Sequence, residues 1–381
     1  MHSTNWKTRN PSGKRRVVAT RELPGERWLE ILKRAQCRVE VNVSADPVSA
    51  SEIKDKIGER CDAVIGQLTE TWGEELLAAL KRAGGKIYAN CAVGFDNVDL
   101  KAAARHEIAV GNTPGVLTET TAEMAVALTL AAARRVGEAE RFVRGGRFTG
   151  WLPTMFLGKL LWCQTLGVIG AGRIGSAYAK MMVEGHKMDL LYFNRGANER
   201  LEYQVAAYGK FLESMGERPV SCARAKSLDE LFEKADCVSL HTSLNESTRH
   251  MIDSRALRLM KKDAILINTS RGPVIDEAAL VDHLKANPEF RAGLDVFEEE
   301  PRLKPGLADL ENVVIVPHIA SASKWTRQGM AVLAASNVSA VLTGLPVWNR
   351  PDISAFLSDN PIKAAPSIVN AKEAGLQILE D

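Results

Sequence analysis

Three residues late in the chain have the side chains that reduction of a keto acid requires. Arg271 can clamp a carboxylate with its two-pronged guanidinium and polarise a neighbouring keto oxygen. His318 can donate a proton to that oxygen as a hydride arrives, and Glu300 would favour the protonated imidazole at neutral pH. Each residue alone is a weak signal, because arginines after strands and runs of glutamates are usually structural. Together they point to a reductase.

A glycine-rich segment, residues 166–175, offers a place for the hydride donor. It reads Leu-Gly-Val-Ile-Gly-Ala-Gly-Arg-Ile-Gly and lies between a predicted strand and a predicted helix. Gly170 permits the tight turn, Gly172 lets the backbone approach a pyrophosphate, and Gly175 lets helix and strand pack closely. Backbone amides near Arg173 and Ile174 would face the phosphates at the positive end of the helix. The motif predicts a dinucleotide site, with a methyltransferase-type nucleotide site as the alternative.

The residue that closes the next strand should distinguish NADH from NADPH. An acidic residue about 20 positions after the glycines would bind the ribose hydroxyls and repel a 2′-phosphate. This chain has Asn194 and Arg195 there. Asn194 can bond a ribose hydroxyl without repelling phosphate, and Arg195 can pair with a 2′-phosphate. Both NADH and NADPH therefore remain open as the cofactor.

Two parallel sheets are predicted to hold these residues. Short apolar runs alternate with helical stretches from about Arg16 to Val110 and, more regularly, from Thr165 to Val316, which favours helices on both faces of each sheet. Strands are expected at 16–20, 38–43, 63–66, 86–89, 165–169, 188–193, 237–240, 264–268, 291–294 and 313–316. Ligands collect at the carboxyl ends of such strands. Arg271, Glu300 and His318 each follow one of these strand ends. Thr269, which directly follows the strand at 264–268, is expected to contact the cofactor.

The α/β fold class is therefore two Rossmann-like, doubly wound parallel-sheet domains. A helix predicted at 119–135 is apolar nearly all round, which indicates burial as a hinge. The residues after the second sheet are too few for a domain and are expected to pack back on the first. We predict a discontinuous substrate-binding (catalytic) domain, 1–117 with 320–381, and a dinucleotide-binding domain, 118–319, with 118–136 as the hinge helix.

Composition argues against several other classes of protein. The net charge is +2, with 45% hydrophobic and 25% charged residues, which suggests neither a nucleic-acid nor a membrane partner. No apolar run reaches the roughly 18 residues of a membrane span. The six cysteines lack metal-binding spacing, so no metal site is predicted and free thiols in a reducing compartment are expected.

The two ends of the chain bear on its compartment. The basic N-terminus is expected to be a solvated, partly flexible segment, with the remnant of an organelle-targeting sequence as the alternative. The C-terminal Leu-Glu-Asp is not a peroxisomal signal. A soluble intracellular protein of the cytoplasm or an organelle matrix is expected, with mitochondrion and plastid left open.

Residues 170–175, 268–273, 293–301 and 317–322 resemble the signature segments of the D-isomer-specific 2-hydroxyacid dehydrogenases, and the likeness covers about residues 16–345. That family has two Rossmann-like domains, the first discontinuous, an active site in the cleft, and a homodimer built on the cofactor domains. The resemblance implies that Arg271, Glu300 and His318 are catalytic. It also implies that Asp295 contacts the carboxamide end of the cofactor.

In the first domain, the resemblance implies that backbone amides of the loop with Val93 and Gly94 hold the substrate carboxylate. The family usually has aspartate where this chain has Asn194, and that departure puts its usual preference for NAD in doubt. Glu300 disfavours a formate dehydrogenase, which pairs its histidine with glutamine.

Within the family, segments 112–123, 151–153, 198–222 and 366–370 are most similar to the plant-type hydroxypyruvate reductases. This implies reduction of hydroxypyruvate to D-glycerate and of glyoxylate to glycolate, as in photorespiration. It further implies that Trp151, or the nearby Trp162, reaches into the active site of the partner subunit, with plain dimer packing as the alternative. Other readings are a phosphoglycerate-type or D-lactate-type dehydrogenase, or a dinucleotide-sensing binding protein of the corepressor kind.

Overall fold

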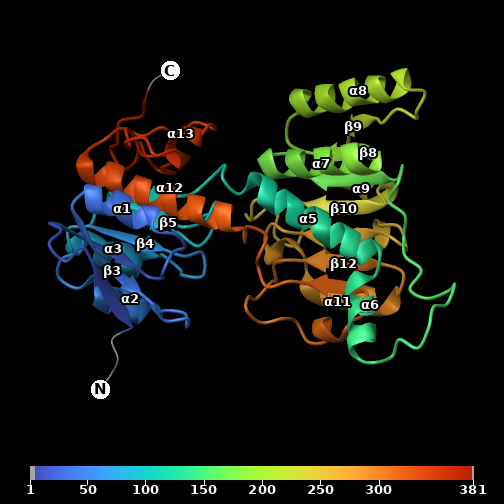
Figure 1. The fold of residues 1–381 in the computed structure, drawn as a ribbon, viewed down its shortest axis with the longest axis horizontal. Coiled ribbons are helices and arrows are strands. Elements are labelled where there is room, and N and C mark those ends of the chain that lie inside the picture. The colour runs from blue at the N-terminus through green and yellow to red at the C-terminus, as the bar shows by residue number, and fades with distance from the viewer. Residues whose placement is uncertain (1–4, 380–381) are drawn as a thin grey trace. The chain divides into compact units, whose positions relative to one another are not determined.

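A computed structural model describes residues 5–379 and divides into two α/β units. Unit 1 consists of residues up to 117 and from 322 onward, and unit 2 of residues 118–321. Each unit holds its own, mainly parallel sheet, which confirms the predicted fold class (Figure 1). Two residues of the C-terminal tripeptide, Glu380 and Asp381, lie outside the described residues.

Unit 1 is built on a six-stranded sheet in the order β1-β3-β2-β4-β5-β6. Its strands are β1 (Trp6–Arg9), β2 (Arg15–Ala19), β3 (Cys37–Asn42), β4 (Ala63–Gly66), β5 (Ile87–Asn90) and β6 (Ala109–Gly111). All neighbours pair in parallel except β1 and β3, which are antiparallel. The carboxyl ends of β2, β4 and β5 therefore meet at one edge of the sheet.

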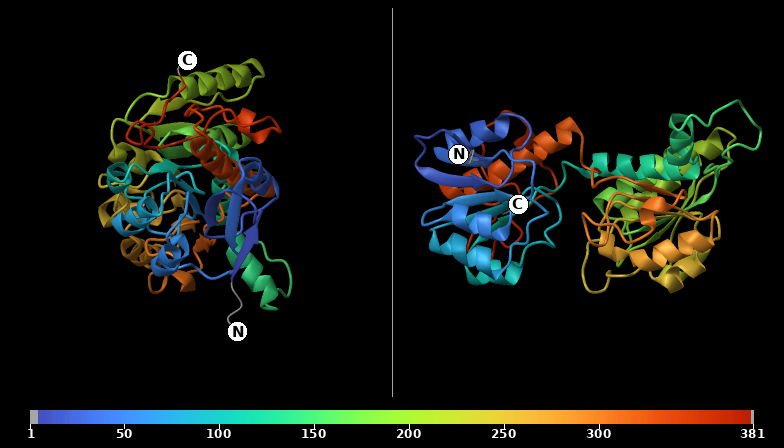
Figure 2. Two further views of the ribbon diagram at one scale, coloured as in Figure 1. Left: turned by 90° about the vertical axis from the view of Figure 1, so that its left-hand side faces the viewer. Right: turned by 90° about the horizontal axis from the view of Figure 1, so that it is seen from below.

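Helices cover both faces of this sheet. A hydrophobic core joins one face to α2 (Ala50–Ile57), α3 (Glu74–Arg82) and α4 (Leu100–Arg105). On the other face, α1 (Arg27–Arg34) packs beside α12 (Lys324–Thr343), which Figures 1 and 2 show as neighbouring ribbons from opposite ends of the sequence. The short α13 (Ser354–Leu357) packs on α12. Most residues of α12 are buried, and this burial explains why the C-terminal segment packs on unit 1.

The N-terminal segment is more ordered than its sequence suggests. Residues Trp6–Arg9 form β1 and pair in register with β3, so the expected flexibility is wrong for these residues, whereas Lys7, Thr8 and Arg9 are exposed as expected. Trp6 packs against the core of unit 1, and the ammonium of Lys56 lies 4.7 Å from its ring centroid. A strand of four residues that are mostly exposed carries no apolar alternation, so no pattern in the sequence indicates β1.

Unit 2 is built on a seven-stranded parallel sheet in the order β13-β12-β11-β10-β7-β8-β9. Its strands are β7 (Thr165–Ile169), β8 (Asp189–Phe193), β9 (Cys222–Arg224), β10 (Cys237–Leu240), β11 (Ile265–Asn268), β12 (Arg291–Leu294) and β13 (Val313–Ile315). Neighbouring strands are paired in parallel throughout, so all their carboxyl ends lie at the same edge.

Two hydrophobic cores cover the two faces of this sheet. One packs α5 (Thr118–Ala133), α7 (Arg173–His186) and α8 (Glu199–Ser214), and the other packs α9 (Leu228–Lys234), α10 (Ser254–Leu259) and α11 (Glu277–Ala286). Helix α6 (Val136–Arg144) follows α5. The helix expected at 119–135 is thus α5, which lies beside α7 and is joined to it by a 2.8 Å hydrogen bond between the Thr129 and Tyr178 hydroxyls (Figure 1).

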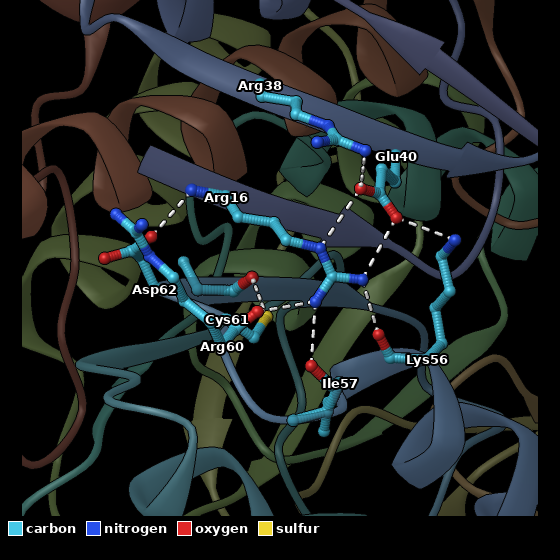
Figure 3. A network of polar contacts seen from close by, with 9 residues as sticks. Arg16, Arg38, Glu40, Lys56, Ile57, Arg60, Cys61 and Asp62 are labelled. Atoms are coloured by element: carbon cyan, nitrogen blue, oxygen red, sulfur yellow. Dashed lines mark hydrogen bonds and ion pairs between the residues drawn. The ribbon is translucent and has the colours of Figure 1, made fainter. Parts of the chain in front are cut away.

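An ion-pair network around the buried Glu40 joins β2, β3 and α2 of unit 1. The guanidinium of Arg16 donates to both oxygens of Glu40, at 3.1 and 3.0 Å (Figure 3). Arg38 and Lys56 pair with the same carboxylate at 2.8 and 2.7 Å. Further N–H groups of Arg16 donate to the carbonyl oxygens of Lys56, Ile57 and Arg60. The hydrogen bond from Arg16, with the nearby Lys56, lowers the pKa of Glu40 to about 2.

Replacing Glu40 by glutamine should destabilise unit 1 at pH 7 by about 3 kcal/mol, because the half-buried Arg16 loses its counter-charge. The folded-state pKa of about 2 lies below the ordinary 4.5, so this stabilisation is complete above about pH 4.5 and is lost as the pH falls towards 2. The loss in Glu40→Gln should therefore shrink as the pH is lowered. Urea unfolding followed by circular dichroism at pH 7 and pH 3 measures it, with the exposed Glu30→Gln as control. An equal loss at both pH values would contradict the assignment.

Candidate functional site

The glycine segment forms the turn from β7 into α7, as its spacing predicts. Gly170 has φ +92°, and a Cβ there would lie 2.6 Å from the carbonyl oxygen of His241. A Cβ on Gly175 would lie 2.2 Å from the carbonyl oxygen of Gly170, so both positions exclude a side chain. Gly172 is the N-cap of the 14-residue helix α7, and a Cβ there would meet nothing within 4 Å. The start of α7, with Arg173 and Ile174, is therefore open to an approaching phosphate group.

Two buried threonine hydroxyls lie at neighbouring strand ends of the same edge. Thr269 follows β11 and Thr242 follows shortly after β10, and neither hydroxyl has a hydrogen-bond partner within the described chain. Buried hydroxyls normally find a partner, so these two suit a polar ligand such as a dinucleotide. Burial lowers the pKa of His241, the residue directly before Thr242, to about 3, which keeps this ring neutral. Thr269 was predicted from the sequence, whereas Thr242 was missed, although it also follows a predicted strand.

Asn194 and Arg195, which are expected to bind the adenosine ribose, directly follow β8. The Asn194 amide donates to the carbonyl oxygen of Gly196 at 3.3 Å, and Arg195 is exposed. Arg224, at the end of the adjacent β9, donates to the carbonyl oxygens of Asn194 and Arg195 at 3.0 and 2.9 Å. Sequence reasoning missed Arg224, because β9 is a short edge strand that was not predicted. Two guanidinium groups at this corner make it cationic.

The loop after β11 positions Arg271. The Asn268 side chain is fully buried, accepts from Ser270 N–H and Oγ at 3.0 and 2.8 Å, and donates to the carbonyl oxygen of Arg271 at 2.8 Å. The Arg271 guanidinium in turn donates to the carbonyl oxygen of Ser270 at 2.8 Å. Asn268 therefore fixes the turn from which the half-buried arginine projects.

Glu300 and His318 form the contact that their spacing suggested. His318 Nδ1 lies 2.9 Å from Glu300 Oε2, and the two side chains are 24% and 30% exposed, so the pair is shielded but reachable. Burial pushes the pKa of Glu300 upward, but the hydrogen bond and charge of His318, the Phe297 N–H and the charge of Arg271 outweigh it. The pKa of Glu300 is therefore lowered, and the residue is ionised at neutral pH.

Asp295, at the end of β12, binds the loop that carries His318. Its fully buried carboxylate accepts from the N–H groups of Ile319 and Ala320 at 2.6 and 3.0 Å, and its carbonyl oxygen accepts from His318 N–H at 2.9 Å. Burial raises the pKa of Asp295 in spite of these bonds. His318 has φ +51°, a conformation that costs a histidine energy and that these three bonds maintain. The side-chain hydrogen bonds of Asp295 thus hold the loop that carries His318.

In unit 1, two carbonyl oxygens of the loop after β5 are bonded to Asn112 and Thr113, which sets the direction of the N–H groups that follow them. The carbonyl oxygens of Ala92 and Val93 accept from Thr113 N–H and from the Asn112 amide, each at 2.9 Å. A trans peptide places N–H opposite C=O, so the N–H groups of Val93 and Gly94 point outward. Asn90 fixes the loop further by donating to the carbonyl oxygen of Gly94 at 2.9 Å. Such a pair of outward amides suits a carboxylate.

Trp151 and Trp162 lie in the segment between α6 and β7. Trp151 is 79% exposed, whereas Trp162 is 46% exposed and has the ammonium of Lys187 at 4.8 Å from its ring centroid. Trp151 is therefore the freer of the two side chains. Among the described residues no group of three or more His, Cys, Asp or Glu could hold a metal ion, and no helix is long and apolar enough to cross a membrane.

Comparisons with known proteins give a consistent result. The family model for the D-isomer specific 2-hydroxyacid dehydrogenase NAD binding domain matches residues 126–320. A Cucumis sativus protein named glycerate dehydrogenase is 60% identical over 370 residues, which cover 96% of this chain and 97% of that protein. An Arabidopsis thaliana protein named peroxisomal glycerate dehydrogenase HPR is 58% identical over 373 residues, 97% of each chain. The structure of an NADPH-dependent glyoxylate/hydroxypyruvate reductase from Sinorhizobium meliloti, with NADP and malonate, has a TM-score of 0.72 and 28% identity over 97% of this chain and 100% of that chain.

Proposed function

Because the chain belongs to the family of D-isomer-specific 2-hydroxyacid dehydrogenases, we propose that it reduces hydroxypyruvate to D-glycerate, and glyoxylate to glycolate, with NADH or NADPH. The geometry that carries this proposal is the 2.9 Å contact between Glu300 and His318, beside Arg271 and at the same sheet edge as the glycine turn. The relatives named glycerate dehydrogenase come from plants, which favours a photorespiratory role.

The substrate carboxylate is assigned to Arg271 together with the outward N–H groups of Val93 and Gly94. A guanidinium binds a carboxylate with two parallel hydrogen bonds and also polarises the adjacent keto oxygen. Unit 1 thereby acts as the substrate-binding domain, and helix α5 as the hinge between the two domains.

Proton transfer is assigned to His318. Its Nδ1 is engaged by the ionised Glu300, so Nε2 is the nitrogen that can donate to the keto oxygen. Glu300 stabilises the imidazolium before transfer and fixes the ring orientation. When bound, the reduced nicotinamide supplies the hydride to the keto carbon; Thr242, Thr269 and the start of α7 would hold the dinucleotide.

Loss of absorbance from the reduced nicotinamide, with hydroxypyruvate and with either NADH or NADPH, tests the function directly. Rapid oxidation with D-glycerate as product supports the proposal. If hydroxypyruvate fails while phosphohydroxypyruvate or pyruvate is reduced, the chain is a dehydrogenase of another type. If no keto acid is reduced although the dinucleotide binds, a sensing protein replaces the enzyme.

A second proposal concerns association with another copy of the chain. Large apolar side chains are exposed along residues 136–162: Val136, Val143, Phe148, Trp151, Leu152, Leu157, Leu160 and Trp162. Such a concentration of exposed apolar surface usually marks an interface. The proposed homodimer covers this segment through the cofactor domains and brings Trp151 to the substrate site of the partner. The cytoplasm or an organelle matrix is the proposed compartment.

The acid–base pair predicts two distinct kinetic effects. His318→Ala should lower kcat by roughly 10²–10⁴-fold, the usual loss for a general acid. Glu300→Gln should lower kcat by a smaller factor, because the amide can still bond Nδ1 but the hydrogen bond is no longer charge-assisted. Steady-state rates between pH 5 and pH 10 measure both. An unchanged kcat in Glu300→Gln would exclude Glu300 as the partner of His318.

The choice of dinucleotide should depend on position 194. Asn194→Asp places a carboxylate where NADPH carries its 2′-phosphate, so KM for NADPH should rise about tenfold or more while KM for NADH stays the same or falls. Initial rates with each dinucleotide at saturating hydroxypyruvate give the two values. Equal changes for both cofactors would show that residue 194 does not face the 2′ position.

Removing apolar surface from the 136–162 segment should weaken the dimer. The double variant Leu157→Ser with Leu160→Ser is expected to sediment as a monomer at concentrations where the unmodified chain is a dimer, and to show a higher KM for hydroxypyruvate because Trp151 of the partner is lost. Phe211→Ser, an equally exposed apolar residue on α8, is the control and should leave sedimentation unchanged. A dimer that persists in the double variant would place the interface elsewhere.

A further inference from the structure

We propose that Glu277, the first residue of α11, is a positioning residue whose buried carboxylate fixes the loop that carries Glu300. The inference rests on the proposed function and adds a residue that lies outside the catalytic set. Glu277 is 3% exposed, which is unusual for a glutamate. A buried carboxylate is costly unless its oxygens are bonded, so the identity of its partners reveals its role.

The partners of Glu277 are the two ends of one loop. Its Oε2 accepts from the backbone N–H of Glu298 at 2.7 Å, and its Oε1 accepts from the backbone N–H of Lys304 at 2.9 Å. Glu300 lies between these two residues in sequence. The side chain of Glu277 therefore ties together the two ends of the loop formed by residues 298–304. This loop contains Glu300, which contacts His318.

Only a carboxylate fits this pair of contacts. Both donors are backbone N–H groups, so both side-chain oxygens must accept. A glutamine in the same place would satisfy one N–H and turn its own NH₂ towards the other. Hydrogen bonds to an ionised acceptor are also shorter and stronger than neutral ones. This explains why a charge is kept at a buried position.

The loop is also seated against the residue next to Arg271. A Cβ on Gly272 would lie 1.8 Å from the carbonyl oxygen of Phe297, so the two backbones are in direct contact. The N–H of Phe297 donates to Glu300 Oε1 at 3.0 Å. A shift of the loop would therefore change the position of Glu300 relative to both Arg271 and His318.

The other charged groups around the loop lie nearer to solvent. Glu298 pairs with His250 at 2.8 Å and with the Lys304 ammonium at 3.6 Å, and that ammonium pairs with Glu299 at 2.7 Å. The side chains of His250 and Glu299 are 41% and 49% exposed. The pairs that include these two exposed side chains contribute little, whereas Glu277 binds the loop backbone at both of its ends.

The first test compares Glu277→Gln with Asp282→Asn, a matched change at an exposed carboxylate of the same helix. Glu277→Gln should lower kcat for hydroxypyruvate by about 10- to 100-fold, the usual effect of a small displacement of catalytic groups. The dissociation constant of NADH, measured by fluorescence titration, should stay unchanged, because the glycine turn belongs to β7 and α7. Asp282→Asn should match the unmodified chain in both values.

The second test repeats the substitution in a Glu300→Gln background. If Glu277 acts through Glu300, its effect on kcat should largely vanish there, whereas a general structural defect would lower the rate by the same factor in both backgrounds. Glu277→Asp, which keeps the charge but shortens its reach, should give a smaller loss and serves if the glutamine variant does not fold.

The outcomes separate this inference from the proposed function. An unmodified chain that reduces no 2-keto acid overturns the function itself. An active chain in which Glu277→Gln retains full kcat, or loses the same factor with and without Glu300, overturns the positioning role alone.

Discussion

The parallel pairing of β11, β12 and β13 is the constraint on which the site depends. Register fixes Asn268 opposite Leu294, and Leu294 opposite Ile315, so the three strands end at nearly the same level. Each following loop then begins at the same edge, although the loops lie tens of residues apart in sequence. Without this pairing, an arginine, a glutamate and a histidine at such separations would have no reason to meet.

Strand ends alone do not orient side chains, and buried polar residues complete the task. Asn268 shapes the Arg271 turn, Asp295 holds the backbone on either side of His318, and Glu277 ties the Glu300 loop. In each case a side chain bonds backbone groups of a loop that lacks regular secondary structure. Such bonds stand in for the backbone hydrogen bonds that these loops lack and fix the backbone from which Arg271, Glu300 and His318 project.

Much of the fold, and the convergence of the three candidate catalytic residues, could be predicted from sequence, because strand periodicity and the glycine turn are local signals. Arg271, Glu300 and His318 stood out by following apolar runs. Glu277 did not, since a glutamate at the start of a helix is ordinary and only the tertiary structure shows the loop it binds. Arg224 and β1 were missed for a similar reason: short edge strands carry little periodicity. The outward amides of Val93 and Gly94 depend on where their carbonyl groups bond, which no side-chain pattern reveals.

The backbone amides also suit the electrostatics of the proposed reaction. In the proposed reaction the guanidinium of Arg271 would neutralise the substrate carboxylate, whereas peptide N–H groups would add no net charge. A second full positive charge on the substrate carboxylate would disfavour the imidazolium that is proposed to supply the proton, whereas a peptide N–H would not. A neutral second ligand is therefore compatible with both substrate binding and a protonated acid. The loop after β5 meets this requirement by directing its carbonyl oxygens to Asn112 and Thr113 and its N–H groups outward.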